Sequence, residues 1–457
     1  MRPHAQSGHR TSRRHSSSDG ADAETTPGFL NAWARLVGAR DLPTVPRRRG
    51  RKPRVPLSDL LPALIFHVMQ GAGTLAEHSA QLFGESLADS SWADRRARLP
   101  WEIFAELMRR LLRPQATRRQ REAFWRGWRL VALDGTQFSL TNTPQITATT
   151  TKARTRRGRA AFAKLTTAVL LELGLHNPLA AAIGRHGESE WALAHQVLAQ
   201  LPQRALLLAD RLYGVAAFVV HARAACARVG SHFLLRASRS TKPRPRKRLR
   251  DGTRLVQIAL RARNRPTRIL EWLEVREIRV RVGRPGHRSH ELRLWTSLVD
   301  PHTAPAIELA QLYAQRWEHE LYFREVKRHL RKTDVLQSHT VETGAQEIAA
   351  IVLVSALLAA ERRRAAGGQI PVLRVSFSKL LELVKPMWLI VQLGEGLLTE
   401  RQINQMLRRA YALMRQCLTA PRRARSCPRA VRRPMKAWPR LLKAQSIKGP
   451  MHFQLLQ

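Results

Sequence analysis

The sequence predicts an α/β protein in which a mixed sheet carries a β-rich insertion and is flanked by helical regions. Three patterns indicate this fold class. Apolar, strand-like segments alternate with helical segments between residues 129 and 237, as in sheets covered by helices on both faces. Residues 239–298 alternate apolar and charged side chains with the period of a strand. The residues before 129 and after Pro301 have mostly helical periodicity.

The composition indicates a folded protein with a large polyanionic partner. Lys and Arg total 79 against 34 Asp and Glu, a formal charge of +45, while 44% of the residues are hydrophobic. A basic protein of the ribosomal type is rarely this long or this apolar. Because the positive charge recurs along the chain, we expect several regions to contact nucleic acid. The basic clusters lie at 46–54, 109–129, 152–159, 240–250, 261–288 and 422–440.

Cysteine usage and apolar runs indicate a cytosolic protein with no membrane partner. Cys226, Cys417 and Cys427 form no CxxC pair, so neither a zinc site nor a disulfide framework is expected. The polar N-terminal residues lack the apolar stretch of a signal peptide. The longest nearly pure apolar run, 348–360, is too short to span a bilayer and predicts a buried helix.

The N-terminal part is expected to be a disordered tail over 1–28 followed by a helical DNA-binding region over 29–128. Short helices are predicted within 74–98, where the second carries Arg95 and Arg96. Such a cluster fits a helix-turn-helix-like DNA-reading surface. An ordinary helical bundle with a solvated basic face fits the same pattern equally well.

The catalytic region is expected over 129–370, and two of its predicted strands end in an aspartate. The predicted strands are 129–133, 165–173, 178–184, 205–210 and 232–237, and the predicted helices between them are 188–201 and 215–229. The first strand is followed by Asp134 and the fourth ends at Asp210. Functional groups of α/β folds lie at such strand ends, and two carboxylates with a third can hold two divalent cations about 3.5–4 Å apart. Either aspartate alone could equally cap a turn.

A helix predicted after Pro305 supplies the third carboxylate. The residues that share one of its faces, within about 60° at about 100° per residue, are Tyr313, Arg316, Glu320 and Lys327. Glu318 and Glu325 fall about 120–140° from Tyr313, on a different face. Glu320 is therefore the carboxylate offered beside two cations and a phenol. The simpler alternative is a local ion pair between Arg316 and Glu320 on a solvated face.

These residues resemble a known signature. The spacing Tyr-x2-Arg-x3-Glu-x6-Lys over 313–327 resembles the YREK motif of the insertion sequence 4 family of DDE transposases. Residues 133–136, Leu-Asp-Gly-Thr, and 209–214, Ala-Asp-Arg-Leu-Tyr-Gly, are similar to that family too. So is the basic motif 425–429, where an aromatic residue is more usual than Cys427. The resemblance covers about residues 50–440.

The resemblance implies a ribonuclease-H-like catalytic core interrupted by the insertion at 239–298, and a helical C-terminal region with a basic tail over 371–457. It also implies that Asp134, Asp210 and Glu320 carry two Mg²⁺ or Mn²⁺ ions. Such bacterial enzymes cut at the ends of a mobile element and join the 3′-OH to target DNA. The partners are then double-stranded DNA, as terminal inverted repeats and target, and a second copy of the chain, because pairing two ends requires two active sites. The expected location is the cytoplasm, at the nucleoid.

Further residues are candidates for DNA contact. Arg316 and Lys327 are expected to hold phosphates close to the metals, and Tyr313 to offer a hydroxyl to the same backbone. The family stacks a flipped base on a tryptophan of the insertion, for which Trp272 and Trp295 are the candidates. Packing within the sheet is the alternative for both.

Two other functions fit the same residues. A nuclease of the same fold would cut DNA without joining ends, and the triad does not separate it from a transposase. An inactive or domesticated transposase would act as a DNA-binding protein. All three carboxylates and the Tyr-Arg-Lys set are present, which argues against decay of the site.

Overall fold

The computed structural model describes residues 57–84, 87–155, 158–283, 289–330, 333–394, 397–420 and 452–456. Three expectations fall outside these residues: the disordered tail at 1–28, the basic cluster at 46–54 and the basic cluster at 422–440 with its motif around Cys427.

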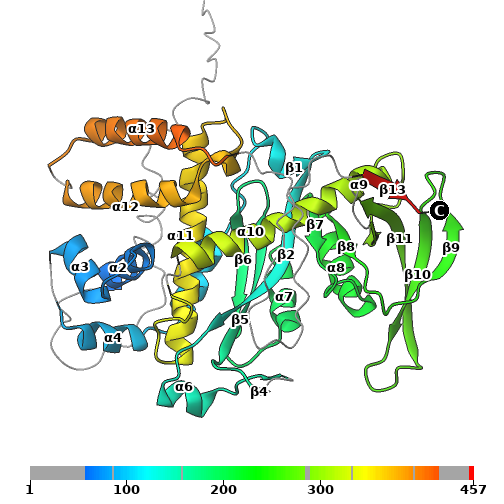
Figure 1. Ribbon diagram of the computed structural model, residues 1–457, viewed down its shortest axis with the longest axis horizontal. Helices are drawn as coiled ribbons and strands as arrows, with labels where there is room; N and C mark the ends of the chain where they lie inside the picture. The colour runs from blue at the N-terminus through cyan, green and yellow to red at the C-terminus, as the bar shows by residue number, and fades with distance from the viewer. Residues whose placement is uncertain are drawn as a thin grey trace, which may run out of the picture.

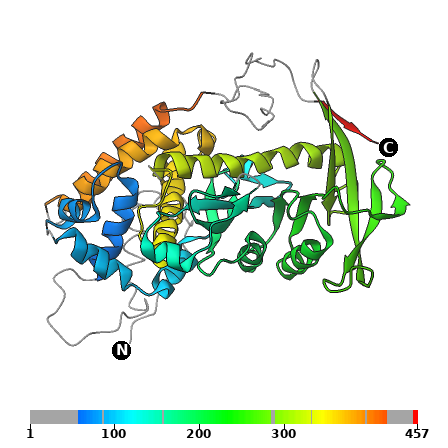
Figure 2. The ribbon, with the colours of Figure 1, turned by 60° about the horizontal axis from the view of Figure 1, so that its bottom comes forward.

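A mixed sheet forms the centre of the molecule, with helices on both faces (Figures 1 and 2). Its first five long strands are β2 (Trp128–Ser139), β5 (Lys164–Glu172), β6 (Asn177–Ile183), β7 (Ala205–Ala209) and β8 (His232–Arg236). In the sheet they lie in the order β6-β5-β2-β7-β8, and β5 alone among these five runs antiparallel to β2. Numbered along the chain this is 3-2-1-4-5, the ribonuclease-H-like arrangement. The predicted fold class is confirmed.

The expectation that the first strand ends at Asp134 was wrong. β2 continues to Ser139, because Gly135 to Ser139 go on pairing with β5 and Phe138 is buried in the core. What ends near Asp134 is the other ladder: the parallel pairing of β2 with β7 stops at Leu133 and Ala209. The aspartates therefore lie where two adjacent strands cease to be hydrogen-bonded to each other.

Helices α7 (Glu190–Leu198) and α8 (Ala216–Arg228) cover one face of the sheet, and α9 (Ala306–Tyr313) and α10 (Trp317–Glu325) run along the other (Figure 2). The Ser189 side chain caps α7 by accepting a hydrogen bond from the Ala192 amide, which fixes where this helix begins. Alternate residues of the strands face the two layers, so the core consists of two apolar clusters, one on each side of the sheet.

The insertion extends this sheet rather than forming a separate one. Its strands are β9 (Arg244–Arg248), β10 (Arg254–Arg261), β11 (Ile269–Gly283) and β12 (His290–Thr296). β12 pairs with β8, and β11, β10 and β9 follow outward in antiparallel order. A strand near the C-terminus, β13 (His452–Leu455), also pairs with β11. The strands expected in this part of the fold are thus present.

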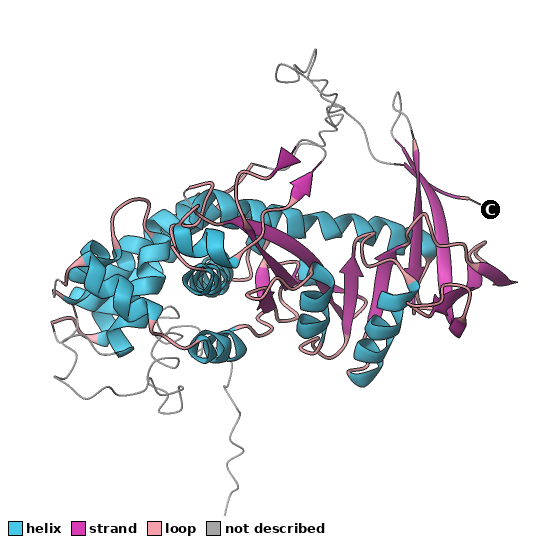
Figure 3. Cartoon of the chain, turned by 90° about the horizontal axis from the view of Figure 1, so that it is seen from below, coloured by secondary structure: helices cyan, strands magenta, loops and turns pink. Residues whose placement is uncertain are grey.

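Helices gather at the opposite end of the molecule from the insertion (Figure 3). N-terminal helices are α2 (Leu57–Met69), α3 (Leu75–Phe83), α4 (Asp89–Ala97) and α5 (Trp101–Leu111), and C-terminal ones are α11 (Val341–Ala366), α12 (Phe377–Leu393) and α13 (Glu400–Gln416). Short elements include β1 (Phe124–Trp125), α6 (Pro144–Thr149), β3 (Arg154–Thr155) and β4 (Gly158–Arg159). α2, α5, α12 and α13 all pack against α11.

Helix α11 contains the apolar run at 348–360 and forms the centre of the helical end. By length and composition alone it would be able to cross a membrane, but 83% of its most apolar window is buried inside the protein. The prediction of a buried helix is therefore confirmed. Its apolar side chains are covered by α2 and α5 on the N-terminal side and by β6 on the sheet side.

Candidate active site

Asp134 and Asp210 lie side by side in the order of the sheet, on adjacent strands. Asp134 is the first residue of β2 beyond the parallel ladder, and Asp210 directly follows β7. The neighbours two residues earlier, Ala132 and Leu208, both belong to the core cluster that includes Tyr313 and Tyr322 of the α9–α10 layer. Because strand side chains alternate, Asp134 points to this same side, and its contacts with α10 agree.

The predicted common face of the helix after Pro305 does face the two aspartate-bearing strands. The Arg316 guanidinium contacts an Asp134 carboxylate oxygen at 3.4 Å and donates a 2.8 Å hydrogen bond to Glu320. The Lys327 ammonium donates to the Thr136 hydroxyl at 2.5 Å and to the Gln137 carbonyl at 3.0 Å. The helix is not uniform, since a 3-10 turn precedes α10 and a π turn follows it, yet Lys327 still reaches β2.

Tyr313 differs from the expectation. Its side chain is buried, and its hydroxyl donates a 3.2 Å hydrogen bond to the Ala209 carbonyl, the last residue of β7. Burial raises the pKa of this phenol well above its ordinary value. The hydroxyl thus supports the backbone that precedes Asp210, and its contact with DNA stays a prediction.

Glu318 and Glu325 lie on the other side of α10, as the helical geometry predicted. Both bind the buried His176 ring: Glu318 contacts Nε2 at 3.0 Å and Glu325 contacts Nδ1 at 2.6 Å. Glu325 also pairs with the buried Arg362 at 3.3 Å. Burial alone would raise the pKa of Glu325, but the charges of His176 and Arg362 outweigh it and lower that pKa to about 2. These two carboxylates anchor α10 by the face that is turned away from Asp134.

The two aspartates differ in their electrostatic surroundings. Burial works to raise the pKa of Asp134, but the neighbouring His319 and Arg316 outweigh it, so that pKa is lowered. Burial lowers the pKa of His319 itself, against the opposing effect of Asp134. For Asp210, burial and the charge of Asp134 raise the pKa above its ordinary value. A cation bound beside Asp210 would stabilise its charged form.

The donor set suits a hard divalent cation. Asp134, Asp210 and Glu320 offer only carboxylate oxygens, the ligands that Mg²⁺ and Mn²⁺ prefer. Within the described part of the chain, no three His, Cys, Asp or Glu side chains are already gathered closely enough to hold a metal. The Arg316 guanidinium instead bridges two of the carboxylates and supplies positive charge between Asp134 and Glu320. The residues fit a divalent ion in chemistry and in charge.

Two residues that the sequence analysis did not single out also belong to this site. His319 is fully buried, and its Nδ1 lies 3.8 Å from an Asp134 oxygen, too far for a hydrogen bond. Glu190, the first residue of α7, accepts a 2.8 Å hydrogen bond from the Tyr213 hydroxyl and lies against Gly135. Burial, together with the charges of Asp134 and Asp210, raises the pKa of Glu190. The available signal was the Ser189 helix cap, which places Glu190 at a helix start.

The structure separates the two tryptophans of the insertion. Trp295 is fully buried and donates a 3.1 Å hydrogen bond to Glu277, which corrects its candidacy for base stacking: it is a core residue on the α8 side. Trp272 is 41% exposed on β11. By the pairing register, Ile278 is the β11 residue that lies level with Asp210 across the sheet. Trp272 lies on the same face of the sheet as Ile278. Six residues separate Trp272 from that row, about 20 Å along the strand.

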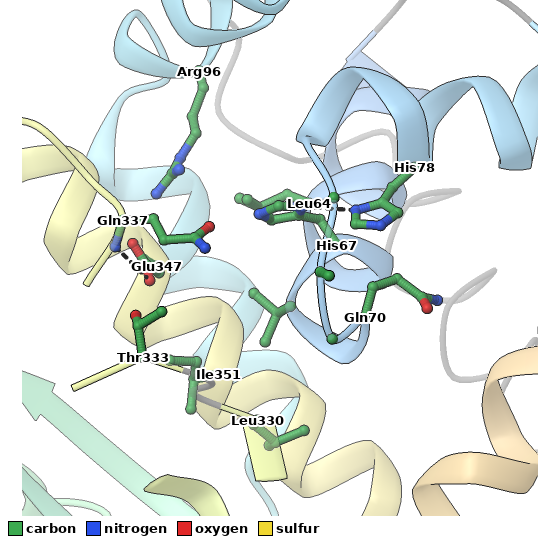
Figure 4. A pocket seen from close by; sticks show the side chains of 14 residues that line it. Leu64, His67, Gln70, His78, Arg96, Leu330, Thr333, Gln337, Glu347 and Ile351 are labelled. Atoms are coloured by element: carbon green, nitrogen blue, oxygen red, sulfur yellow. Dashed lines mark hydrogen bonds between the residues drawn. The ribbon is translucent and has the colours of Figure 1, made fainter. Parts of the chain in front are cut away.

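Arg95 and Arg96 of α4 also differ from each other. Arg96 donates hydrogen bonds to the Ser338 hydroxyl at 2.9 Å and the Thr343 carbonyl at 2.6 Å, at the start of α11. Figure 4 shows it pointing toward Gln337 and Glu347, in a pocket that α2 and the loop after it line on the other side. These contacts lock α4 to α11, and the DNA contact of Arg96 stays a prediction. Arg95 is half-buried with its guanidinium 6.0 Å from the Trp92 ring, and its DNA contact stays a prediction.

The sheet has the strand order 3-2-1-4-5. One acidic residue lies on its first strand just beyond the parallel ladder, and another directly follows its fourth strand. This arrangement defines the class of ribonuclease-H-like proteins. A model of the family "Transposase DDE domain" matches residues 125–357, which include all three candidate carboxylates. The chain belongs to this family, and is an insertion sequence 4 type DDE transposase.

Two relatives from Escherichia coli are transposases too. The chain is 27% identical over 333 residues, 71% of its length and 72% of the relative's, to the transposase InsG for insertion sequence element IS4 of Escherichia coli (strain K12). It is 30% identical over 128 residues, 28% of its length and 43% of the relative's, to the putative transposase InsZ of the same organism. A solved structure, the piggyBac transposase synaptic complex with hairpin DNA, matches with a TM-score of 0.43 at 7% identity over 86% of this chain and 82% of that one.

Proposed function

We propose that this DNA transposase cleaves the ends of a bacterial insertion sequence and joins them to target DNA with Asp134, Asp210 and Glu320 as its catalytic carboxylates. The observation that carries the proposal is the position of Arg316, whose guanidinium contacts both Asp134 and Glu320. The Arg316 guanidinium thereby brings together two carboxylates from distant parts of the chain. They lie beside β7, the strand that Asp210 follows. An isolated surface ion pair between Arg316 and Glu320 would not include Asp134.

Asp134, Asp210 and Glu320 would hold two Mg²⁺ or Mn²⁺ ions. When bound, such ions activate an attacking water or 3′-OH and stabilise the leaving oxygen of the phosphodiester. The residues of the chain prepare this site in advance: Tyr313 holds the end of β7, while His176 and Arg362 hold α10 from behind. Preorganised ligands of this kind are a general requirement of catalytic sites.

Arg316 and Lys327 would bind the phosphates of the DNA next to the carboxylates. Arg316 is free to exchange its contact with Asp134 for a phosphate oxygen once a divalent ion neutralises that carboxylate, and guanidinium binds phosphate bidentately. Lys327 lies over the Thr136–Gln137 end of β2, beyond the aspartate, where DNA that enters the site would pass.

The remaining parts of the proposal concern how DNA is recognised. The helical region within 29–128 would read the terminal inverted repeats, with Arg95 as its candidate contact, and the region 371–457 would add basic contacts. The catalytic domain would span 129–370. Exposed Trp272 would stack an unpaired base away from the scissile phosphate. Two copies of the chain would act together on two ends, in the cytoplasm at the nucleoid.

A cleavage and joining assay tests the proposal. Duplexes that carry the element end are incubated with Mg²⁺ and the wild-type chain, and nicked, cleaved and joined products are separated on gels. D134N and D210N should lose cleavage but retain binding to end DNA. Normal cleavage by D134N at equal protein concentration would contradict the assignment. Cleavage without any joined product would favour the nuclease of the same fold, and binding without cleavage by the wild type would favour a domesticated DNA-binding protein.

A further inference from the structure

Glu190 connects the two aspartate-bearing segments from the α7 side of the sheet. The Tyr213 hydroxyl donates a 2.8 Å hydrogen bond to its carboxylate, and Tyr213 is fully buried. Tyr213 closes the turn that begins at Asp210, because its amide donates to the Asp210 carbonyl at 3.2 Å. The carboxylate of Glu190 therefore holds the far end of the turn that carries Asp210.

The same carboxylate lies against β2 directly beside Asp134. A Cβ atom built on Gly135 would be 2.2 Å from the Glu190 carboxyl carbon, so a larger residue at 135 would displace the Glu190 carboxylate from this place. Gly135 does not have a positive φ, which means that the glycine is needed for space and not for an unusual backbone conformation. This explains the Asp134-Gly135 pair by a close approach of another segment rather than by a turn.

The next residue of α7 strengthens this connection. Trp191 donates from its indole nitrogen to the Leu212 carbonyl at 3.4 Å, and the Leu212 amide donates to the Asp210 carboxylate at 2.7 Å. The start of α7 thus contacts the turn at 210–213 at two points. Because the parallel ladder between β2 and β7 has already ended, backbone hydrogen bonds between these strands do not fix the separation of Asp134 and Asp210.

We infer that Glu190 is a positioning residue of the carboxylate centre, which sets the separation of Asp134 and Asp210 through Tyr213 and Gly135. The inference rests on the proposed function, since it takes the two aspartates as ligands of divalent cations. Groups that orient metal ligands in this way generally contribute 10-fold to 100-fold to metal affinity. Removing the Glu190 side chain should therefore weaken divalent-ion binding without abolishing it.

The experiment measures Mn²⁺ affinity by isothermal titration calorimetry on the full chain without DNA. E190A should weaken binding by about 10-fold or more. E190Q keeps an oxygen that accepts from Tyr213 and should stay within about threefold of wild type, while Y213F should lie between the two. E188A is the matched control: Glu188 lies two residues away and accepts a 2.7 Å hydrogen bond from the His186 amide, so wild-type affinity is expected.

The possible outcomes distinguish a failure of this inference from a failure of the proposed metal site. Wild-type affinity for both E190A and Y213F, with matched thermal midpoints, would overturn the positioning role. Loss of affinity in E190Q as large as in E190A would also overturn it, because the charge and not the position would then matter. Loss of Mn²⁺ binding in D134N together with normal binding in E190A rejects only this inference. Unchanged binding in D134N would instead reject the metal site of the proposed function, whatever E190A does.

Discussion

Replacing Glu325 with glutamine should destabilise the protein without removing its chemistry. The carboxylate is held between the buried His176 and Arg362, and its pKa is lowered from 4.5 to about 2. A pKa that lies about 2.5 below its ordinary value corresponds to about 3 kcal/mol of stabilisation. Breaking a buried ion pair by removing one partner costs about 3–5 kcal/mol in general, which agrees. E325Q should therefore lose about 3 kcal/mol of unfolding free energy at pH 6.

The pH dependence gives this prediction its sign. Since the folded pKa of Glu325 lies below its unfolded value of 4.5, its contribution is complete above about pH 4.5 and is lost as the pH falls toward 2. The pKa of His176 is raised above 6.5 by Glu325 and Glu318 against the effect of burial, so its contribution is complete below pH 6.5 and is lost as the pH rises through the raised value. Together the two groups favour the window between about pH 4.5 and 6.5.

Urea titrations between pH 3 and 8 measure the effect. In E325Q the unfolding free energy should change less with pH on both the acidic and the basic side. E382Q removes a surface carboxylate paired with Lys385, and its unfolding free energy should stay within about 0.5 kcal/mol of wild type. Folded E325Q at low temperature should still cleave end DNA, because this residue faces away from Asp134. Destabilisation below about 1 kcal/mol, or an unchanged acid limb, would refute the reasoning from the buried pair.

Three further predictions follow from the site and the charge. E320Q should abolish end cleavage while E318Q keeps most of it in the same gel assay; the reverse result would mean that α10 presents its other face. Trp295→Ala should cost about 3–5 kcal/mol of stability in thermal melts, because it leaves a cavity in the core. Trp272→Ala should cost little stability but weaken DNA binding, measured by fluorescence anisotropy, by about 1–3 kcal/mol. Affinity for duplex DNA should fall by about 10³–10⁵ between 50 and 200 mM salt if six or more phosphates are contacted, and a shallow salt dependence in anisotropy titrations would contradict distributed charge contacts.

Local periodicity was sufficient to predict most strands and helices of the core. β5, β6, β7 and β8 lie within a residue or two of the predicted segments because each is a short apolar run between turn residues. The end of β2 was missed for a physical reason. Asp134-Gly135-Thr136 has the composition of a turn, but these residues continue an antiparallel ladder with β5, a partner that the local sequence does not reveal.

The helical spacing predicted the geometry of α10 better than the fate of individual side chains. A period of 3.6 residues separated Glu320 from Glu318 and Glu325 correctly, since that depends on the helix alone. It did not reveal that Tyr313 is buried against the Ala209 carbonyl, because burial depends on which strand lies beneath the helix. The same holds for Trp295, whose strand parity turns it toward α8 and away from the face that Trp272 occupies.

The N-terminal helices are part of the core as well as candidates for reading DNA. Leu61 and Leu64 of α2 and Ile103 and Phe104 of α5 are almost fully buried, and both helices pack against α11. Deleting them would expose the apolar surface of α11. If a truncated chain then failed to discriminate end DNA, the cause could be misfolding as well as lost recognition. Recognition by α4 is better separated from stability by a substitution at Arg95, whose neighbour Arg96 carries the contacts that hold this helix in place.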